Sequence, residues 1–177
     1  MTLPGDLSYE ERVKRMIRVN HAGEYGAKRI YAGQLAVLGK SACAPTLKHM
    51  AEQEAQHLDT FSRMMIERRV RPTVLMPLWH VGGFAMGAAT ALLGEKAAMA
   101  CTVAVESVID DHYAGQEQTL GDDEVALKSV ITKFRADEKE HHDTALHLGA
   151  EASPLYHILT SLIVLQTKLA IWLSTRI

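Results

Sequence analysis

Two copies of the motif Glu-x-x-His are the residues most able to support chemistry in this sequence. One copy runs from Glu54 to His57 and the other from Glu138 to His141. Residues three positions apart lie on one face of a helix, about one turn apart, so each pair can reach a single metal ion. One copy alone is a weak signal, because glutamate-rich helices produce it by chance on a solvated face. The second copy favours metal binding.

Each motif is preceded by another glutamate at nearly the same distance. Glu24 lies 30 residues before Glu54, and Glu106 lies 32 residues before Glu138. A turn is expected near the middle of each interval, so antiparallel folding would bring each lone glutamate level with its motif. The sequence therefore contains an internal repeat, offset by 82 residues at the lone glutamates and by 84 at the motif glutamates.

Two such helical hairpins, placed face to face, would gather four carboxylates and two imidazoles. This is the known ligand pattern of ferritin-like di-iron and di-manganese bundles. Four carboxylates balance two divalent ions, which offsets the cost of burying charge, and oxygen with imidazole ligands suits iron or manganese. We expect Glu54 and Glu138 to bridge the ions, with Glu24 and Glu106 terminal, each beside one histidine. The predicted metal ligands are Glu24, Glu54, His57, Glu106, Glu138 and His141.

Other polar residues near the motifs have weaker claims. Asp137 is either a surface residue or a hydrogen-bond partner of a metal-bound imidazole, a common supporting role. His142 is an alternative to His141, but the first copy of the motif fixes the spacing at three and favours His141. The remaining carboxylates lie outside the helix faces that carry the motifs, and we expect them to be solvated: Glu52, Asp59 and Glu140. The remaining histidines have no counterpart in the other half of the repeat, and we expect them to be ordinary surface or packed residues: His21, His49 and His147.

The elements that would position these ligands are all helices. Good helix formers dominate, only five prolines occur, and alternating β-branched runs are almost missing. Ser8 with Glu11 reads as a capping box at the start of the first helix. Pro77 is expected to delay the third helix to residue 78. The expected helices are about Ser8–Leu38, Pro45–Arg69, 78–94, Glu95–Leu120, Asp123–Leu148 and Leu155–Ser174.

The predicted fold class is all-α, a ferritin-like four-helix bundle with two additional apolar helices. A length of 177 residues fits one domain, spanning 1–177. Its two hairpin halves would cover about 8–70 and 95–150, and the apolar segments would be 74–94 and 155–174.

Bulk composition narrows the function classes. The formal net charge is −2, which gives no sign of the basic face that nucleic-acid binders carry, so no nucleic-acid partner is expected. The two cysteines, Cys43 and Cys101, are too few for a disulfide framework and lie in apolar surroundings. They favour a reducing compartment.

Both apolar segments are candidates for a membrane surface. Segment 74–94 has no formal charge and enough length to span a bilayer, but its glycines favour a buried or membrane-touching helix. Its small residues would leave room for a chain-like ligand or allow close helix contact. In the last helix, Thr160, Gln166 and Lys168 favour lying in the interface over spanning. The alternative is that both segments merely cover the bundle.

Four blocks of sequence resemble the demethoxyubiquinone hydroxylase family, the di-iron monooxygenases of ubiquinone biosynthesis. The blocks are residues 20–27, 71–79, 100–106 and 138–143, and the likeness extends from about Arg15 to the C-terminus. All six iron-ligand positions of the family fall on the six residues identified above. Ser107 stands where some members carry a second glutamate, which should not disturb the metal set.

The resemblance implies a substrate, a co-substrate, a metal cofactor, a reductant and a pair of residues for electron transfer. The substrate would be a polyprenylated demethoxyubiquinol, hydroxylated on its ring with O2 at two iron ions, with NADH as the reductant. His112 and Tyr113 match a histidine–tyrosine pair that the family associates with electron transfer. The other interpretation of Tyr113 is a core-facing aromatic residue.

A polyprenyl tail is insoluble in water, so the resemblance also implies a peripheral membrane protein. Its place would be the cytoplasmic face of a bacterial inner membrane or the matrix face of the mitochondrial inner membrane. Further partners would be other ubiquinone-biosynthesis proteins, including a lipid-binding accessory protein. Two alternatives stay open: a ferritin-like iron oxidase or storage protein, and a non-catalytic helical membrane adaptor.

Overall fold

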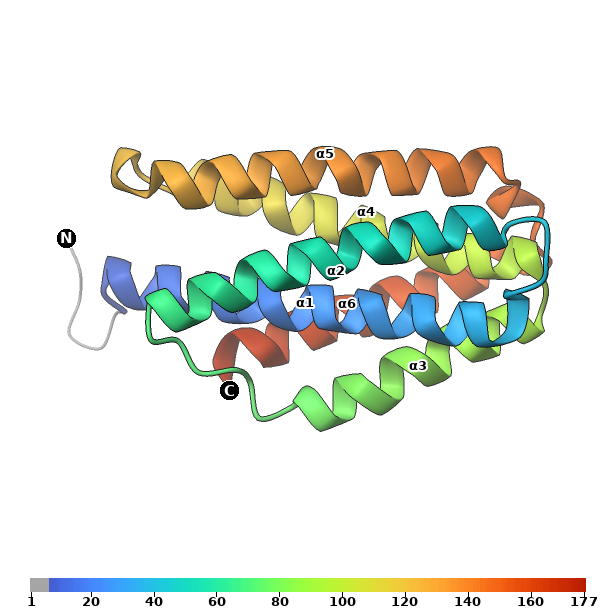
Figure 1. Cartoon of the computed structure of the whole chain (residues 1–177), viewed down its shortest axis with the longest axis horizontal. Coiled ribbons are helices and arrows are strands. Elements are labelled where there is room, and N and C mark those ends of the chain that lie inside the picture. The colour runs from blue at the N-terminus through green and yellow to red at the C-terminus, as the bar shows by residue number, and fades with distance from the viewer. Residues whose placement is uncertain (1–6) are drawn as a thin grey trace.

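The computed structural model describes residues 7–177, so the first six residues of the predicted 1–177 domain lie outside the described part. Helices are the only regular elements between residues 7 and 177 (Figure 1). The α-helices are α1 (Tyr9–Leu38), α2 (Ala44–Glu67), α3 (Met76–Leu92), α4 (Glu95–Thr119), α5 (Val125–His147) and α6 (Tyr156–Arg176), with short 3₁₀ turns η1 (Asp122–Glu124) and η2 (Ala150–Ala152).

The start of α1 confirms the capping box predicted from the sequence. The hydroxyl of Ser8 accepts a hydrogen bond from the backbone N–H of Glu11 at 3.2 Å, and the Glu11 carboxylate accepts one from the backbone N–H of Ser8 at 2.8 Å. Two otherwise unpaired donors are thereby satisfied. Gly39 ends the helix, and Pro45 lies in the first turn of α2, as expected.

The predicted starts of two helices were wrong. Helix α3 begins at Met76 and not at residue 78, because Pro77 occupies the first turn, where a missing N–H costs no intrahelical hydrogen bond. It ends at Leu92, two residues early. Helix α5 begins at Val125, because Asp122–Glu124 form the η1 turn.

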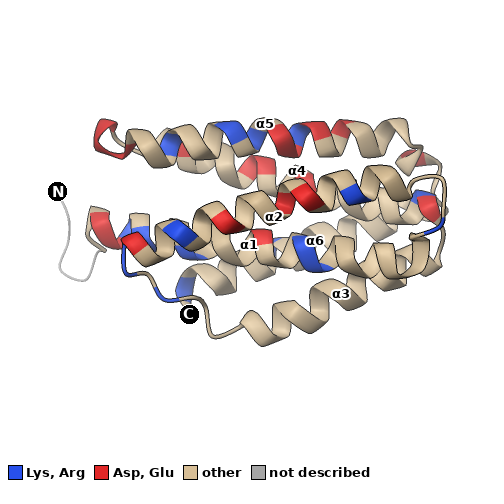
Figure 2. Cartoon of the chain, in the orientation of Figure 1, with Lys and Arg blue, Asp and Glu red and all other residues tan. Residues whose placement is uncertain are grey.

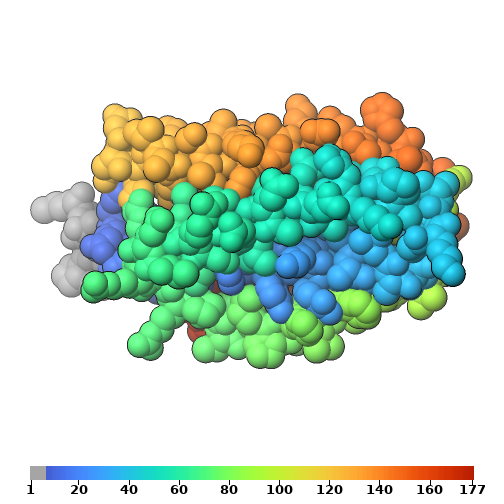
Figure 3. All heavy atoms as spheres, viewed as in Figure 1, coloured from blue at the N-terminus to red at the C-terminus, as the bar shows by residue number. Residues whose placement is uncertain are grey.

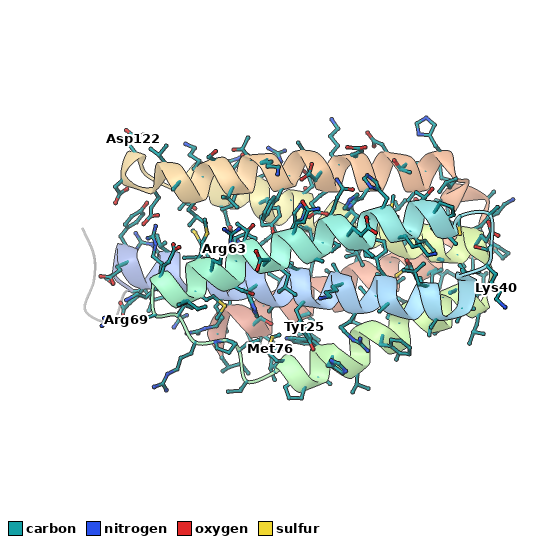
Figure 4. The ribbon with its side chains drawn as sticks, viewed as in Figure 1. Tyr25, Lys40, Arg63, Arg69, Met76 and Asp122 are labelled. Carbon is teal, nitrogen blue, oxygen red and sulfur yellow. The ribbon has the colours of Figure 1, made fainter. Side chains whose placement is uncertain are left out.

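Two antiparallel hairpins, α1–α2 and α4–α5, form the four-helix bundle (Figure 1). Lys40 marks one end of the bundle, while Arg69 and Asp122 lie at the other (Figure 4). At that second end, the two terminal nitrogens of the Arg68 guanidinium group, Nη1 and Nη2, donate to the two carboxylate oxygens of Glu124, at 2.6 and 2.7 Å. This two-point contact ties the end of α2 to the turn before α5.

Helix α4 is buried far more completely than a single helical stripe implies. Every residue from Ala97 to Glu106 is buried, because α5, α6, α3 and α1 all pack against this helix. Small side chains such as Ala98, Ala100 and Ala104 allow the neighbouring helices to come close. The result is a central helix that holds one predicted ligand, Glu106, in the dry interior.

Helix α3 lies unusually close to α1 because glycines face the contact. A methyl group built on Gly87 would fall 2.0 Å from the backbone oxygen of Ile30, and one on Gly33 would fall 2.2 Å from that of Phe84. Neither position can hold a side chain without separating the helices. Close contact is thus one use of the small residues in segment 74–94.

Helix α6 packs against α4 and α1, the same two helices of the bundle that α3 contacts. Among residues 7–177 it is the one helix long and apolar enough to cross a membrane, judged by length and composition. Helix α3 carries no charged side chain (Figure 2). The architecture is therefore the predicted ferritin-like four-helix bundle with two additional apolar helices.

Candidate metal centre

The structure brings all six predicted ligands together in the middle of the bundle, in two overlapping groups. In each group the possible ligand atoms lie within 4.8 Å of one another, close to the separation expected around one ion at a metal–oxygen distance of about 2.1 Å. Glu54 and Glu138 belong to both groups, which is the position of bridging ligands. The first group adds Glu24 and His57, and the second adds Glu106 and His141.

These six side chains are almost completely withdrawn from water, with at most 2% of their surface exposed. Figure 3 shows the atoms of α2 (green to cyan) lying against those of α5 (orange) on the outside of the bundle. Four carboxylates in such a space repel one another and have lost their hydration, so protons or cations must compensate them.

The pKa values of the ligands show this conflict. Burial, and next the charge of Glu138, raise the pKa of Glu54 and Glu106 well above the ordinary value. Burial also favours protonation of Glu138, but contacts with His141 and His57 outweigh it and lower its pKa to about 2. Burial lowers the pKa of His57, but contacts with Glu138 and Glu24 outweigh it and raise that pKa to about 10.

The side-chain atoms that face the centre and could bind a metal ion have no hydrogen-bond partner within the described chain. They comprise both carboxylate oxygens of Glu54 and of Glu138, one of Glu24, one of Glu106, and the Nδ1 atoms of His57 and His141. Buried polar atoms are normally paired, and such a cluster of unpaired ones calls for a ligand. Oxygen and imidazole donors in this number fit two divalent cations.

Each imidazole points one nitrogen inward and the other outward. Nδ1 of His57 lies 3.4 Å from Glu24 Oε2 and 3.3 Å from Glu138 Oε1. On the outward side, Nε2 of His57 lies 3.0 Å from Asp137 Oδ2, the contact anticipated for Asp137. His141 has the same orientation, with its Nε2 3.1 Å from Gln53 Oε1. Sequence reasoning missed Gln53, although it precedes Glu54 as Asp137 precedes Glu138.

Two tyrosines hold the terminal carboxylates. The Tyr31 hydroxyl donates to Glu106 Oε1 at 2.7 Å, and the Tyr113 hydroxyl donates to Glu24 Oε1. Each terminal glutamate thus keeps one oxygen free to face the centre. Sequence reasoning did not assign a role to Tyr31. The signal was present, because Tyr31 and Tyr113 each follow a lone glutamate by seven residues.

The other polar candidates lie where the sequence placed them. His142 is turned away from the centre and lies beside Asp143, with its Nδ1 3.0 Å from an Asp143 oxygen. His21 is half-buried. The remaining candidates are exposed: Glu52, Asp59, Glu140, His49 and His147.

His112, the other residue of the predicted electron-transfer pair, belongs to a small polar network on the α1–α4 interface. The side-chain amides of Asn20 and Gln116 donate to each other at 2.8 Å, and Gln116 also donates to Nε2 of His112 at 2.8 Å. Burial lowers the pKa of His112 to about 4. The imidazole is therefore neutral at physiological pH.

A cavity of about 300 Å³ reaches the centre from the side of the two apolar helices. Its walls come from α1, α3, α4 and α6, and they are mostly apolar, with residues such as Ile30, Met86 and Leu173. Glu24, His112 and Tyr113 line it as well. The volume is at the lower end of the range typical of small-molecule sites. The cavity thus connects the candidate metal centre with the apolar face of the protein.

Comparison with known proteins gives a consistent result. A family model described as ubiquinone biosynthesis protein COQ7 matches residues 11–174. A 3-demethoxyubiquinol 3-hydroxylase of Rhodospirillum rubrum is 54% identical over 176 residues, which cover 99% of this chain and 83% of the relative.

Mitochondrial relatives are also similar. A protein of Homo sapiens named NADPH-dependent 3-demethoxyubiquinone 3-hydroxylase, mitochondrial, is 53% identical over 169 residues, covering 93% of this chain and 78% of the relative. The 5-demethoxyubiquinone hydroxylase, mitochondrial, of Saccharomyces cerevisiae is 44% identical over 180 residues, covering 92% and 77%.

Proposed function

Because the chain belongs to the family described as ubiquinone biosynthesis protein COQ7, we propose that it hydroxylates the ring of a polyprenylated demethoxyubiquinol, with O2 as co-substrate. The observation that carries the proposal is the apolar cavity that is lined by Glu24, one of the six gathered ligands. An apolar substrate can reach the candidate metal centre through it without crossing the charged surface of the bundle.

We propose that the six gathered side chains hold two iron ions, with Glu54 and Glu138 shared between them. When bound, the iron would supply the reducing equivalents and the open coordination positions that O2 activation needs. The protein contributes the fixed geometry. Tyr31 and Tyr113 hold one oxygen of each terminal carboxylate, which leaves the other aimed at the centre.

The cavity contributes the placement of the ring and the exclusion of water. Its apolar walls favour an aromatic ring and the first units of an isoprenoid tail. The tail would leave between α3 and α6, which both pack on α1 and α4 and whose backbones stay apart from each other within the described chain. The Trp79 indole N–H donates to the Ser174 hydroxyl at 3.0 Å across this gap.

His112 and Tyr113 are our candidates for electron transfer between the ring and the metal centre. Both line the cavity, and Tyr113 also contacts the terminal ligand Glu24. A neutral His112 fits this role, because it can form a hydrogen bond with a quinol hydroxyl without carrying a buried charge. The other interpretation of Tyr113, a core-facing aromatic residue, agrees with its burial but does not account for its contact with Glu24.

We propose that the protein lies on a membrane through the exposed faces of α3 and α6. Large apolar side chains stay more than half exposed there, among them Leu78, Val81, Ile158, Leu162 and Leu165. A surface of this kind is expected to be covered by a membrane or by a partner protein. Flotation with liposomes tests this: Leu165→Ser should reduce binding, whereas Val125→Ser, at an equally exposed residue at the start of α5, should not.

The two alternative functions fit less well. An iron store needs no apolar cavity leading to its metal centre, and a non-catalytic adaptor needs no buried ligand set. The similar proteins described above are all named as hydroxylases.

The decisive experiment is a turnover assay. The iron-loaded protein is incubated with demethoxyubiquinol and isotopically labelled O2, and the product is examined by mass spectrometry for one added labelled oxygen. Parallel reactions start from the quinone with NADH or NADPH, because the resemblance implies NADH whereas the names of several relatives specify NADPH. Glu138→Ala serves as the inactive control. Iron-loaded protein that leaves the quinol unchanged would refute the proposed function.

A further inference from the structure

The two halves of the metal centre are nearly symmetric, but their outward imidazole contacts differ in charge. Nε2 of His57 meets the carboxylate of Asp137 at 3.0 Å, whereas Nε2 of His141 meets the side-chain amide oxygen of Gln53 at 3.1 Å. These two partners occupy the same place in the repeat, one residue before each motif glutamate. One imidazole is therefore supported by an anion and the other by a neutral group.

The difference affects the strength of the imidazole as a ligand. Nδ1 of each histidine faces the centre, so Nε2 carries the hydrogen and donates it outward. An anionic acceptor draws that hydrogen more strongly than an amide oxygen does. Electron density then shifts towards Nδ1, which becomes a better donor to a metal ion.

The remaining surroundings of the two positions are closely matched. Both histidine side chains are 2% exposed. Each terminal glutamate receives one tyrosine hydroxyl, from Tyr113 or Tyr31, and the bridging glutamates serve both positions. Apart from the cavity, which Glu24 lines and Glu106 does not, the outward partner is thus the clearest difference between the two halves.

We propose that Asp137 and Gln53 make the two metal positions unequal, so that a divalent cation fills the Glu24–His57 position first and the Glu106–His141 position second. This inference rests on the metal centre of the proposed function. Loss of such outward partners in metal sites typically changes affinity by about 10–100-fold. The side chain of Asp137 is 23% exposed, and because water partly screens its charge we expect a difference of about 10-fold.

The order of filling has a functional consequence. Glu24 lines the cavity, and Glu106 does not. The position that binds its ion more tightly is therefore the one beside the substrate cavity.

The order is measured by titrating the metal-free protein anaerobically with Fe²⁺ in a calorimeter, which resolves the successive binding steps. Crystals grown with one equivalent of Fe²⁺ and examined by anomalous diffraction identify the occupied position. We expect two binding steps, with the first ion between Glu24 and His57.

Matched variants separate this inference from simple damage to the fold. Asp137→Asn should weaken the first step, and Gln53→Glu should strengthen the second. The double variant should reverse the order, so that the first ion appears beside His141. Glu140→Gln, an exposed change on the same helix as Asp137, should leave both steps unaltered.

The possible failures are distinguishable. Two equal binding steps in the unchanged protein, or an unreversed order in the double variant, would overturn the inequality while leaving the metal centre intact. A protein that binds no Fe²⁺ at all would overturn both the inequality and the proposed function.

Discussion

Removing the metal ions should lower the melting temperature of this protein substantially. The six predicted ligands are at most 2% exposed in the folded chain and lie on four different helices, so the unfolded chain offers no comparable site. Ions that bind only the folded state stabilise it by mass action. Chelation therefore removes stabilisation and leaves four buried carboxylates to repel one another.

The magnitude follows from the occupancy of two positions. A free metal concentration 100 times the dissociation constant stabilises the folded state by about 2.7 kcal/mol for each position, or about 5 kcal/mol for two. In a domain of this size, 1 kcal/mol shifts the melting temperature by about 2–4 °C. We therefore expect a fall of roughly 10–20 °C on chelation.

The fall should be larger at high pH. In the metal-free protein the folded pKa values of Glu54 and Glu106 lie above the ordinary 4.5, so the folded state holds protons that the unfolded state releases. The pKa of His57 is also raised, from 6.5 to about 10. Stability from such groups is present at low pH and is lost as pH rises through the folded pKa. The metal-free protein should therefore lose stability from pH 6.5 upward.

The metal-loaded protein should behave differently, because fewer protons compete for the ligands as pH rises. The assay is a thermal melt followed by circular dichroism, with and without an excess of chelator, at pH 6.5 and at about pH 8.5. Metal removal is verified by elemental analysis. Chelator should not affect the melt of Glu138→Ala. An unchanged melting temperature after verified metal removal, or a gap between the two forms that narrows at higher pH, would refute the reasoning.

Three further substitutions test particular contacts. The free energy of unfolding of each metal-loaded variant is measured by chemical denaturation. Gly87→Ala should destabilise, because its methyl group would fall 2.0 Å from the backbone oxygen of Ile30, and overpacking costs about 1–3 kcal/mol or more. Tyr31→Phe should cost about 1–3 kcal/mol, because it removes the hydrogen bond to the buried Glu106. Ser8→Ala should cost about 1 kcal/mol, because it removes the cap of α1.

Matched controls accompany two of these changes. A methyl group on Gly82, in the same helix as Gly87, would meet nothing within 4 Å, so Gly82→Ala should be neutral or stabilising by up to about 1 kcal/mol. Tyr25 contacts His80 at the surface between α1 and α3 (Figure 4), and Tyr25→Phe should cost less than Tyr31→Phe. Equal effects within either pair would contradict the contacts assigned to Gly87 or Tyr31.

Much of the candidate site could be predicted before the structure, because its signals lie within single helices. The Glu-x-x-His spacing places two side chains on one face through helical geometry alone. The repeat of a lone glutamate about 30 residues upstream then required only a turn and an antiparallel return. For the same reason the capping box at Ser8 was readable from two residues.

Contacts between helices were not readable in this way. Gln53, Tyr31 and the amide network of Asn20 all meet partners that lie far away in the sequence. Which residue they meet depends on how each helix is rotated and how far it is shifted along its neighbour. Many side chains set those quantities together, so no local spacing encodes them.

By itself, the sequence determined that the chain is helical, that it repeats, and which six side chains share faces suited to metal, since a helix turns through a fixed angle at each residue. Only the tertiary structure decided that residues 97–106 of α4 are buried on every side, that glycines bring α3 against α1, and that Glu24 lines an apolar cavity. Those features arise where surfaces from separate helices meet, and the shape left between them is a property of the assembled bundle.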